Sequence, residues 1–204
     1  SRYQAKVLLA GKSGPFFSPD GQMICYRSDR DGSGRLQVFV ATLRFEAGDD
    51  GVPVPVGVER EFQITANEHV NWAPFWHPSG NFLVYASSEV GHTNYEVFAV
   101  KVDRAALEAG QTPAEIPRRR VTYATGADVL PAFSADGEWF LWTAQRGEPA
   151  RGETRPSSQL WVARWRGGDD PFAVPAREVP MTPAPEGEAA GGGRPASGGG
   201  AGTR

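Results

Sequence analysis

Residues 71–102 read NWAPFWHPSGNFLVYASSEVGHTNYEVFAVKV, and their pattern indicates the fold class of the chain. It carries three apolar runs rich in Val, Phe, Tyr and Trp, which are side chains that suit a pleated, half-buried surface. The runs occupy residues 73–76, 82–86 and 95–102. His-Pro-Ser-Gly at 77–80 separates the first two runs, and Gly91 lies between the second and the third. Because Pro and Gly at such places mark tight turns, the stretch predicts three antiparallel strands in a row.

The same pattern occurs twice more along the chain. PFFSPDG at 15–21 aligns with PFWHPSG at 74–80 and with PAFSADG at 131–137. Each turn is followed by two apolar runs, at 23–26 and 38–40, at 82–85 and 97–99, and at 139–142 and 160–162. Each unit is predicted to end in a short strand that closes on Thr, at 62–65, 120–122 and 179–182. A period of about sixty residues with four strands each favours tandem propeller blades.

The turn Phe/Trp-Ser/His-Pro-Asp/Ser-Gly resembles the repeat of TolB-like β-propellers. The best match is SPDG at 18–21 followed by SDRDG at 28–32, and the resemblance covers about residues 6–182. The second unit has Ser79 where the repeat has Asp, and the third has Ala135 where it has Pro. We therefore expect an all-β fold: a β-propeller fragment of three four-stranded antiparallel blades, which belongs to a propeller of six to eight blades.

The expected boundaries follow from the repeats. Residues 1–10 end a preceding blade, and three blades occupy 11–66, 67–125 and 126–182. Residues 183–204 consist almost entirely of Pro, Ala, Gly, Glu and Ser, a composition that predicts a disordered tail or linker. Three blades leave an apolar face bare at both ends. This feature, with a first residue other than Met and no signal peptide, predicts a piece of a longer protein.

Three connections between strands are long. Residues 44–58 contain Val-Pro-Val-Pro, which favours extended backbone without ladder donors, and we expect a loop there. At 103–110, Asp103 is placed to cap one or two helical turns that Gly110 ends. The charged, Gly- and Pro-rich residues 146–158 predict a mobile surface loop.

Composition excludes several classes of function. The net charge is −3, and the one basic run, at 118–120, leads into a predicted strand, so nucleic-acid binding is disfavoured. The single Cys25 lies in an apolar run and cannot form an internal disulfide, so it is expected to be a small buried hydrophobe. No apolar stretch reaches the length of a membrane span.

The sequence contains only weak matches to motifs for catalysis, phosphate binding or metal binding. AGKS at 10–13 has Lys6 where a phosphate loop needs Gly, and DRDGSG at 29–34 lacks the Glu of a calcium loop, so both are interpreted as turns. Gly-x-Ser-x-Gly and His-Glu-x-x-His do not occur. His77 belongs to the face opposite His69 and His92, so a three-histidine metal site is disfavoured; a weak pairwise site of those two with Glu68 is conceivable. We predict no catalytic residue, no metal site and no cofactor.

The predicted binding face carries the loops before strand one and between strands two and three of each blade. Binding residues tend to lie on loops that a rigid scaffold holds, and Trp is a frequent hot-spot residue. Trp72 is the first candidate, although it could instead pack between neighbouring blades. The full set of candidates is Arg30, Glu68, His69, Trp72, His92 and Asp128.

Three functions remain open. The TolB-like resemblance implies a non-catalytic scaffold that binds a protein or peptide at the bacterial cell envelope, hence a periplasmic or otherwise extracytoplasmic location, with further blades or a second copy as another partner. The alternative is an accessory propeller of a larger peptidase, of the prolyl-oligopeptidase type or a zinc aminopeptidase, that gates or positions substrate. A weaker third possibility is a propeller that binds a sugar or another small ligand. Fold resemblance alone does not choose among them.

Overall fold

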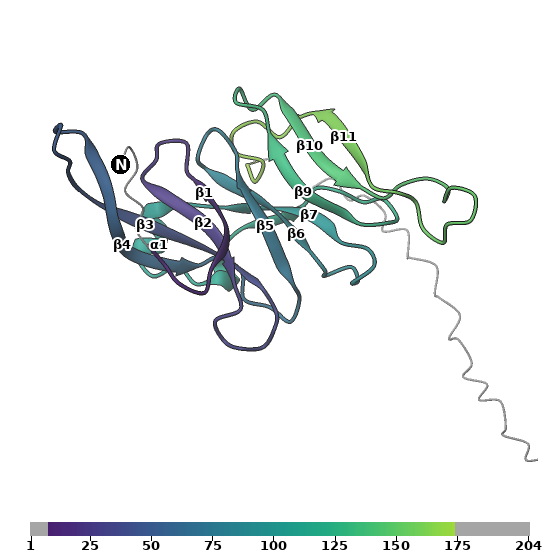
Figure 1. Cartoon of the computed structure of the whole chain (residues 1–204), viewed down its shortest axis with the longest axis horizontal. Helices are drawn as coiled ribbons and strands as arrows, with labels where there is room; N and C mark the ends of the chain where they lie inside the picture. The colour runs from purple at the N-terminus through teal and green to yellow at the C-terminus, as the bar shows by residue number, and fades with distance from the viewer. Residues whose placement is uncertain (1–7, 174–204) are drawn as a thin grey trace, which may run out of the picture.

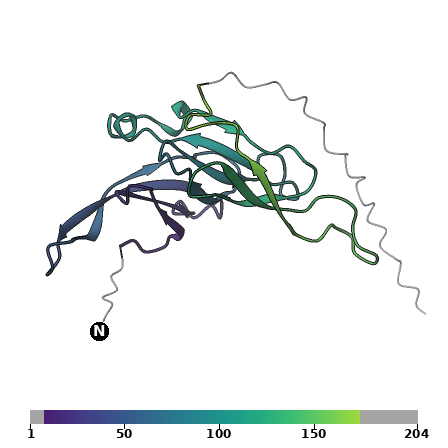
Figure 2. The same cartoon turned by 90° about the horizontal axis from the view of Figure 1, so that it is seen from above.

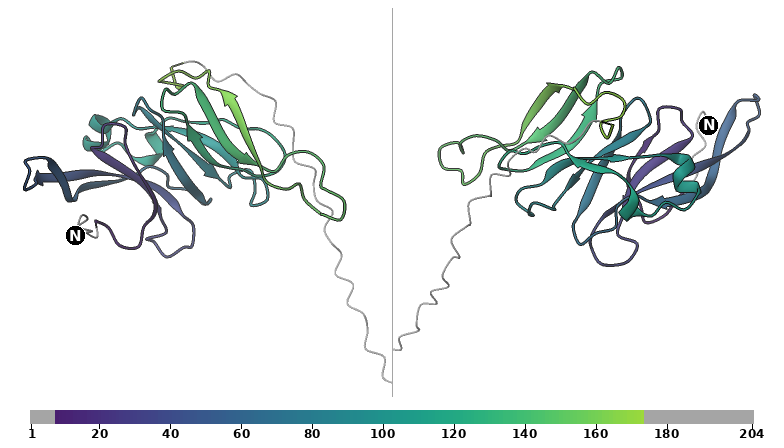
Figure 3. Two further views of the ribbon diagram at one scale, coloured as in Figure 1. Left: turned by 45° about the horizontal axis from the view of Figure 1, so that its top comes forward. Right: turned by 180° about the vertical axis from the view of Figure 1, so that it is seen from behind.

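A computed structural model describes residues 8–173 as three antiparallel sheets that follow one another along the chain (Figures 1 and 3). Strand order in each sheet is the order in the sequence, so each sheet is one predicted blade. The strands of blade one are β1 (Ser13–Phe17), β2 (Met23–Ser28), β3 (Gln37–Ala47) and β4 (Pro53–Gln63). Those of blade two are β5 (Asn71–Trp76), β6 (Phe82–Ser87), β7 (Glu96–Lys101) and β8 (Arg118–Arg120). Blade three has β9 (Asp128–Phe133), β10 (Trp139–Ala144) and β11 (Gln159–Arg164).

The all-β partial propeller is thus confirmed, with four strands in blades one and two and three in the described part of blade three. The fourth strand predicted at 179–182, and the tail at 183–204, lie outside the described residues. In blade two the last strand covers the three arginines themselves and ends two residues earlier than predicted. No helix within residues 8–173 is long and apolar enough to cross a membrane.

The repeated turn between the first two strands is held by its own side chains. Ser18 Oγ donates to Asp20 at 2.6 Å and accepts from the Met23 N–H at 2.8 Å. Ser134 makes the same two bonds in blade three, to Asp136 at 2.5 Å and from Trp139 at 2.9 Å. Because the Gly of each turn has a φ between 69° and 74°, a residue without a side chain is favoured there.

A bulge in the first strand of every blade was not predicted. The ladder between the first two strands shifts register at the same place in all three blades. The residue at the bulge has positive φ: 64° at Gly14, 52° at Ala73 and 53° at Leu130. Only Gly14 gives a hint in the sequence, because Ala and Leu do not ordinarily mark a left-handed backbone.

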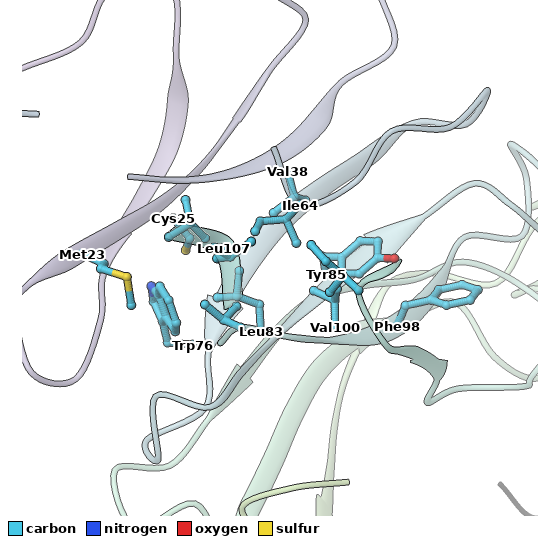
Figure 4. Close-up of a cluster of buried hydrophobic side chains, with 13 residues drawn as sticks. Met23, Cys25, Val38, Ile64, Trp76, Leu83, Tyr85, Phe98, Val100 and Leu107 are labelled. Carbon is cyan, nitrogen blue, oxygen red and sulfur yellow. The ribbon is translucent and has the colours of Figure 1, made fainter. Parts of the chain in front are cut away.

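Two apolar clusters join the blades. In the first, Met23, Cys25 and Val38 of blade one pack against Leu83 and Tyr85 of blade two (Figure 4). The second cluster joins blades two and three and consists of Phe82, Val84, Val97, Ala99, Phe133, Phe140, Trp142 and Ala144. All of these side chains are buried, so the contacts between blades form the hydrophobic core of the molecule.

The expected loop at 44–58 is wrong, because these residues form most of a long hairpin. Strand β3 runs to Ala47 and β4 starts at Pro53, and the end of the hairpin projects beyond the rest of its sheet (Figures 1 and 2). Strand β4 is an edge strand, and a proline is tolerated there because its missing N–H is not needed by an outer neighbour. The Val-Pro-Val-Pro pattern therefore marks an edge strand.

The predicted short helix is present as α1 (Arg104–Glu108), which precedes a 3₁₀ turn at Pro113–Glu115. Asp103 Oδ1 accepts from the Ala106 N–H at 3.1 Å and so caps its first turn. Gly110, with a φ of 100°, follows its end. Leu107 points into the cluster between blades one and two (Figure 4), so the helix adds to the core.

The expectation of a bare apolar face at both ends holds only for blade three. In blade one the corresponding outer residues are buried: Ile24, Tyr26, Phe39, Ala41 and Leu43. Leu8 and Leu9 pack against them, and residues 1–7, predicted as part of a preceding blade, lie outside the described residues. In blade three, Leu160 and Val162 are 78% and 61% exposed.

Candidate functional site

Trp72 lies near the start of β5, at the edge where the predicted binding loops meet. It is half-buried, and its ring stands at 88° to that of Tyr95 with centroids 6.3 Å apart. The Arg27 guanidinium of blade one lies over the Trp72 ring, 5.4 Å from its centroid. Trp72 therefore contacts the neighbouring blade and keeps part of its surface open, and its role in binding stays a prediction.

His92 joins the same group from the β6–β7 connection. Its Nδ1 lies 3.4 Å from the Tyr95 hydroxyl, and the two ring centroids are 6.1 Å apart. We call Arg27, Trp72, His92 and Tyr95 the aromatic–cationic cluster. Of the six candidates, it contains Trp72 and His92.

Arg27 and Tyr95 were missed by the sequence reasoning, although a signal for them exists. In the other blades Ala86 and Thr143 align with Arg27, while Leu36 and Ser158 align with Tyr95. Residues that every repeat keeps serve the fold, so side chains that only one repeat has are free to serve binding. A comparison of the repeats position by position would have found them.

The Arg27 guanidinium has N–H donors available for a binding partner. Its Nε donates to Ser13 Oγ at 2.8 Å, and none of the ion pairs among residues 8–173 involves it. Its two terminal nitrogens therefore retain N–H groups for an acceptor on a partner. The cluster offers aromatic surface and a cation together.

Glu68 and His69 do not join the cluster. Glu68 pairs with Arg35 at 2.6 Å, and its side chain is 82% exposed, so the pair contributes little to stability. His69 is held through its backbone: its carbonyl accepts from Gln37 Nε2 at 2.9 Å and its N–H donates to Asn67. Within residues 8–173, no three His, Cys, Asp or Glu side chains gather as a metal site would need.

Arg30 serves the outer part of blade one. Its guanidinium donates to Glu61 at 2.8 Å and to the Tyr26 hydroxyl at 3.0 Å, and it covers the Phe39 ring at 4.0 Å. Burial raises the pKa of Tyr26, so its hydroxyl stays protonated and donates to Glu61. These contacts give Arg30 a structural role.

Asp128 is fully buried between blades two and three, which argues against its place on a binding surface. Arg146 donates to its two oxygens at 2.6 and 3.2 Å, and the Trp142 ring N–H lies 3.3 Å from Oδ1. Near it lies the equally buried Glu96, bonded by Arg120 at 2.7 Å and by the Thr122 hydroxyl. Burial raises the pKa of Glu96 and the charge of Asp128 adds to it, while Thr122 and Arg120 act in the opposite direction.

His77 lies at the opposite edge of the blades, as its place in the turn predicts. It is buried and stacks on Phe82 with centroids 4.4 Å apart, and Phe133 stands across it at 4.7 Å. Burial lowers the pKa of His77, so a neutral ring is favoured. Its Nδ1 is 2.9 Å from Ser79 Oγ, which repeats the Ser–Asp contact of the other turns. His77 therefore forms part of the packed core between blades two and three.

A cavity of about 780 Å³ opens at the edge where His77 lies, between the turn at 18–21 of blade one, the turn at 77–80 of blade two and α1. Its charged side chains already have partners: Lys101 pairs with Asp170 at 3.2 Å and Arg104 with Glu108 at 2.8 Å. Asp20 and Asp103 are used by the turn and by the helix cap. The aromatic–cationic cluster is the better candidate, because it keeps both unpaired donors and aromatic surface.

No family model matches the sequence. Among solved structures, a putative TolB from Agrobacterium tumefaciens is similar over 75% of this chain and 43% of its own, with a TM-score of 0.47 and 17% identity. TolB from Acinetobacter baumannii is similar over 77% of this chain and 30% of its own, with a TM-score of 0.45 and 22% identity. Hydrazine synthase from Kuenenia stuttgartiensis has a TM-score of 0.56 at 12% identity, over 78% of this chain and 25% of its own.

The chain thus spans less than half the length of the TolB structures it matches. At these identities the similarity concerns the fold. Three sheets with sequential strands, joined face to face through apolar clusters, form the part of a β-propeller that the TolB-like repeats predicted.

Proposed function

We propose that this chain is part of a non-catalytic, TolB-like propeller scaffold that binds a protein or peptide through the aromatic–cationic cluster. One observation supports the proposal: Arg27 and Trp72, from two different blades, stack on one another at the edge that carries the predicted binding loops, and both are only partly buried. Trp, Tyr and Arg are the residue types most enriched among interface hot spots. The rigid core beneath them limits the ordering cost of binding.

The contacts favour an extended peptide segment over a small ligand. The cluster runs from β2 through β5 to the β6–β7 connection, so it crosses the boundary between two blades. None of the described cavities is lined by its side chains. An open surface that spans two blades suits side chains presented along a peptide better than an enclosed small molecule.

The test is a selection of displayed random peptides on the immobilised full chain, followed by titration of the selected peptides. Trp72→Ala and Arg27→Ala should each raise Kd about tenfold or more, because each removes a central contact. Arg60→Ala is the matched control, since Arg60 also covers an aromatic ring, Phe62 at 5.2 Å, but in β4 of the outer hairpin. Equal loss in all three variants, or no peptide selected above background, would contradict the proposal.

We also propose an extracytoplasmic location, which the TolB-like resemblance implies. The alternative, an accessory propeller of a larger peptidase, has the same propeller fold. It differs in that the same polypeptide would also contain a catalytic domain. A hydrolase or metallopeptidase domain encoded in the same gene would replace the scaffold proposal by that alternative, and its absence would favour the scaffold.

A further inference from the structure

Blade one differs from the other two blades in the segment that follows its third strand. In blade two this segment contains α1, and Leu107 of α1 is buried in the cluster between blades one and two. In blade three, Phe172 of the corresponding segment packs against the cluster between blades two and three. In blade one the segment instead forms a hairpin that projects beyond its sheet (Figures 1 and 2), and we call residues 44–57 the hairpin arm. Because the other blades pack without such an arm, its surface is free to serve binding.

The hairpin arm has a fixed base and an ordered tip. At the base, Phe45 and the adjoining Val58 pack against the buried outer residues of blade one. At the tip, the Gly48 N–H donates to the Val52 carbonyl at 2.9 Å, and Asp50 Oδ1 accepts from the Val52 N–H at 3.0 Å. A surface that is already ordered loses little conformational entropy when a partner binds.

One face of the hairpin arm forms a cavity of about 440 Å³ together with Leu8. Its apolar lining includes Val54, Val56 and Leu8, and Val54 remains 46% exposed. Val52, next to the tip, is 58% exposed. Exposed aliphatic side chains beside a cavity of this size can bind the aliphatic side chains of a partner.

The same cavity has an acidic rim. Glu46 and Asp49 line it, and Asp50 follows them at the tip. None of the ion pairs among residues 8–173 involves these three acids. The one arginine of the arm, Arg44, is at its base. The excess of negative charge favours Lys or Arg on the partner and disfavours nucleic acid and anionic lipid, which carry charge of the same sign.

The free edge of the hairpin arm is poorly suited to the addition of another strand. The Gly48 N–H bonds the Val52 carbonyl across the hairpin. Because the backbone groups of successive residues point to opposite edges, Pro53 and Pro55 stand where an N–H would face the free edge. A partner strand would find no donors at those two positions. The arm therefore favours side-chain contacts over a shared sheet.

We propose that the hairpin arm binds a protein partner through a segment in which aliphatic side chains are flanked by Lys or Arg. The aliphatic side chains enter the cavity beside Val54 and Val56, and the basic ones pair with Glu46 and Asp49. The arm leaves the edge of blade one that carries the turn at 18–21, opposite the edge of the aromatic–cationic cluster. This site is therefore separate from the proposed peptide site and does not depend on it.

Two other occupants fit less well. The arm of a second copy would bring acids against acids. Residues 1–7 precede Leu8 in the sequence and contain Arg2 and Lys6, but Val7 is their one large aliphatic residue. The experiment separates both of these occupants from a partner.

The experiment titrates the isotope-labelled full chain with a synthetic peptide of sequence GKLKVKLG with blocked ends and follows the backbone amides by NMR. The largest shifts should fall within residues 44–57. Two control peptides, GKSKSKSG without the aliphatic side chains and GQLQVQLG without the charges, should each bind at least about fivefold more weakly. Val54→Ser and the double variant Glu46→Gln/Asp49→Asn should each raise the Kd of the first peptide about fivefold or more.

The matched controls remove side chains of the same kinds elsewhere. Leu160→Ser removes an aliphatic side chain of blade three that is 78% exposed, and Glu59→Gln removes an exposed acid of β4 outside the arm. Both should leave the Kd unchanged. Shifts mainly outside the arm, equal binding of all three peptides, or a loss in either control variant as large as in Val54→Ser would overturn the proposal.

Two further results would identify another occupant and would also overturn the proposal. Tighter binding of the first peptide to the double variant Arg2→Ser/Lys6→Ser would show that residues 1–7 occupy the cavity. Shifts of the arm amides that grow with the concentration of the chain, without any peptide, would show that a second copy occupies it.

Discussion

The two interfaces between blades are built on the same backbone contact but differ in charge. Between blades one and two, the residues that meet are the amides Gln37 and Asn71. Between blades two and three, the equivalent residues are the buried acids Glu96 and Asp128. Each acid has its own arginine, at 2.7 Å for Glu96 and 2.6 Å for Asp128. At the interface where two acids replace two amides, each acid is thus accompanied by a cation, which offsets the cost of burying its charge.

Both interfaces between blades leave hollows at their edges. In the first interface, Leu107 and Ile116 from the connection before β8 are buried, and Ile116 also lines a cavity of about 280 Å³. The second leaves a cavity of about 470 Å³ lined by Val121, Phe140, Trp142, Ala163 and Trp165, among others. Ala163 aligns with Val100 of blade two, which is fully buried.

Removal of Asp128 should be the most damaging single change. Asp128→Ala leaves Arg146 without its partner and should lower the free energy of unfolding by about 3–5 kcal/mol. Asn71→Ala at the same position of the first interface removes neutral hydrogen bonds only and should cost about 1–3 kcal/mol. Chemical denaturation of both variants measures the difference, and equal losses would remove the contrast between the interfaces.

The closing Thr residues of blades one and two should stabilise the two interfaces. Thr65 Oγ1 accepts from the Val38 N–H at 2.9 Å, and Thr122 Oγ1 from the Val97 N–H at 2.8 Å. Thr→Val at either site leaves a buried N–H unsatisfied and should cost about 1–3 kcal/mol, with the larger loss at Thr122 because its hydroxyl also bonds Glu96. Thr93→Val, at an exposed loop position, is the control and should be within about 0.5 kcal/mol of the parent. A larger loss at Thr65 would reverse the ranking.

The charged interface should make stability depend on pH. Because burial raises the pKa of Glu96 in the folded state, its proton stabilises the fold at low pH, below the unfolded pKa of about 4.3. This contribution is lost as the pH rises through the raised pKa of the folded state. Glu96→Gln, which copies Gln37, should flatten that fall in denaturation series between about pH 4 and pH 8. Glu68→Gln, at an exposed pair, should keep the slope of the parent; an unchanged slope in Glu96→Gln would mean that another group titrates.

Partial filling of the second interface should have the smallest effect. Ala163→Val copies Val100, adds apolar volume beside the cavity and suits a strand, so we expect a gain of about 0.5–1 kcal/mol. For a chain of this size the melting temperature should rise by about 1–4 °C. Ala163→Gly should lower it. A lower melting temperature in Ala163→Val would show that the cavity cannot take a larger side chain.

Much of the fold could be predicted because its signals are local. Apolar runs, the Ser-x-Asp-Gly turn and the Asp103 cap each depend on neighbours within a few residues, as Ser18 and Asp20 show. The hairpin at 44–58 does not follow from the sequence pattern, because proline lacks the N–H group that pairs neighbouring strands. Whether a proline is tolerated depends on the strand being at an edge, and an edge is a property of the sheet.

The candidate site was only half predictable for a related reason. Asp128 is the first residue of β9 and Trp72 the second residue of β5, and both lie in predicted loops. The structure buries Asp128 against Arg146 and Trp142, whereas Trp72 stays half-exposed under Arg27. The repeat aligns Asp128 with the buried Asn71 and Trp72 with Val129, so the two positions differ by one step along the strand. The residues that surround each of them come from other strands and from neighbouring blades, which the local sequence does not specify.

Most strands, the repeated turn and the tandem order of the blades can be predicted from neighbouring residues, because alternation, turn chemistry and repeat period are local features. Which equivalent positions are covered, and which residues meet across blades, depends on how the sheets pack against one another. Val97 and Leu160 align in the repeat, yet one is 0% and the other 78% exposed. Burial depends on what packs against a sheet, and that surface comes from another blade about sixty residues away along the chain.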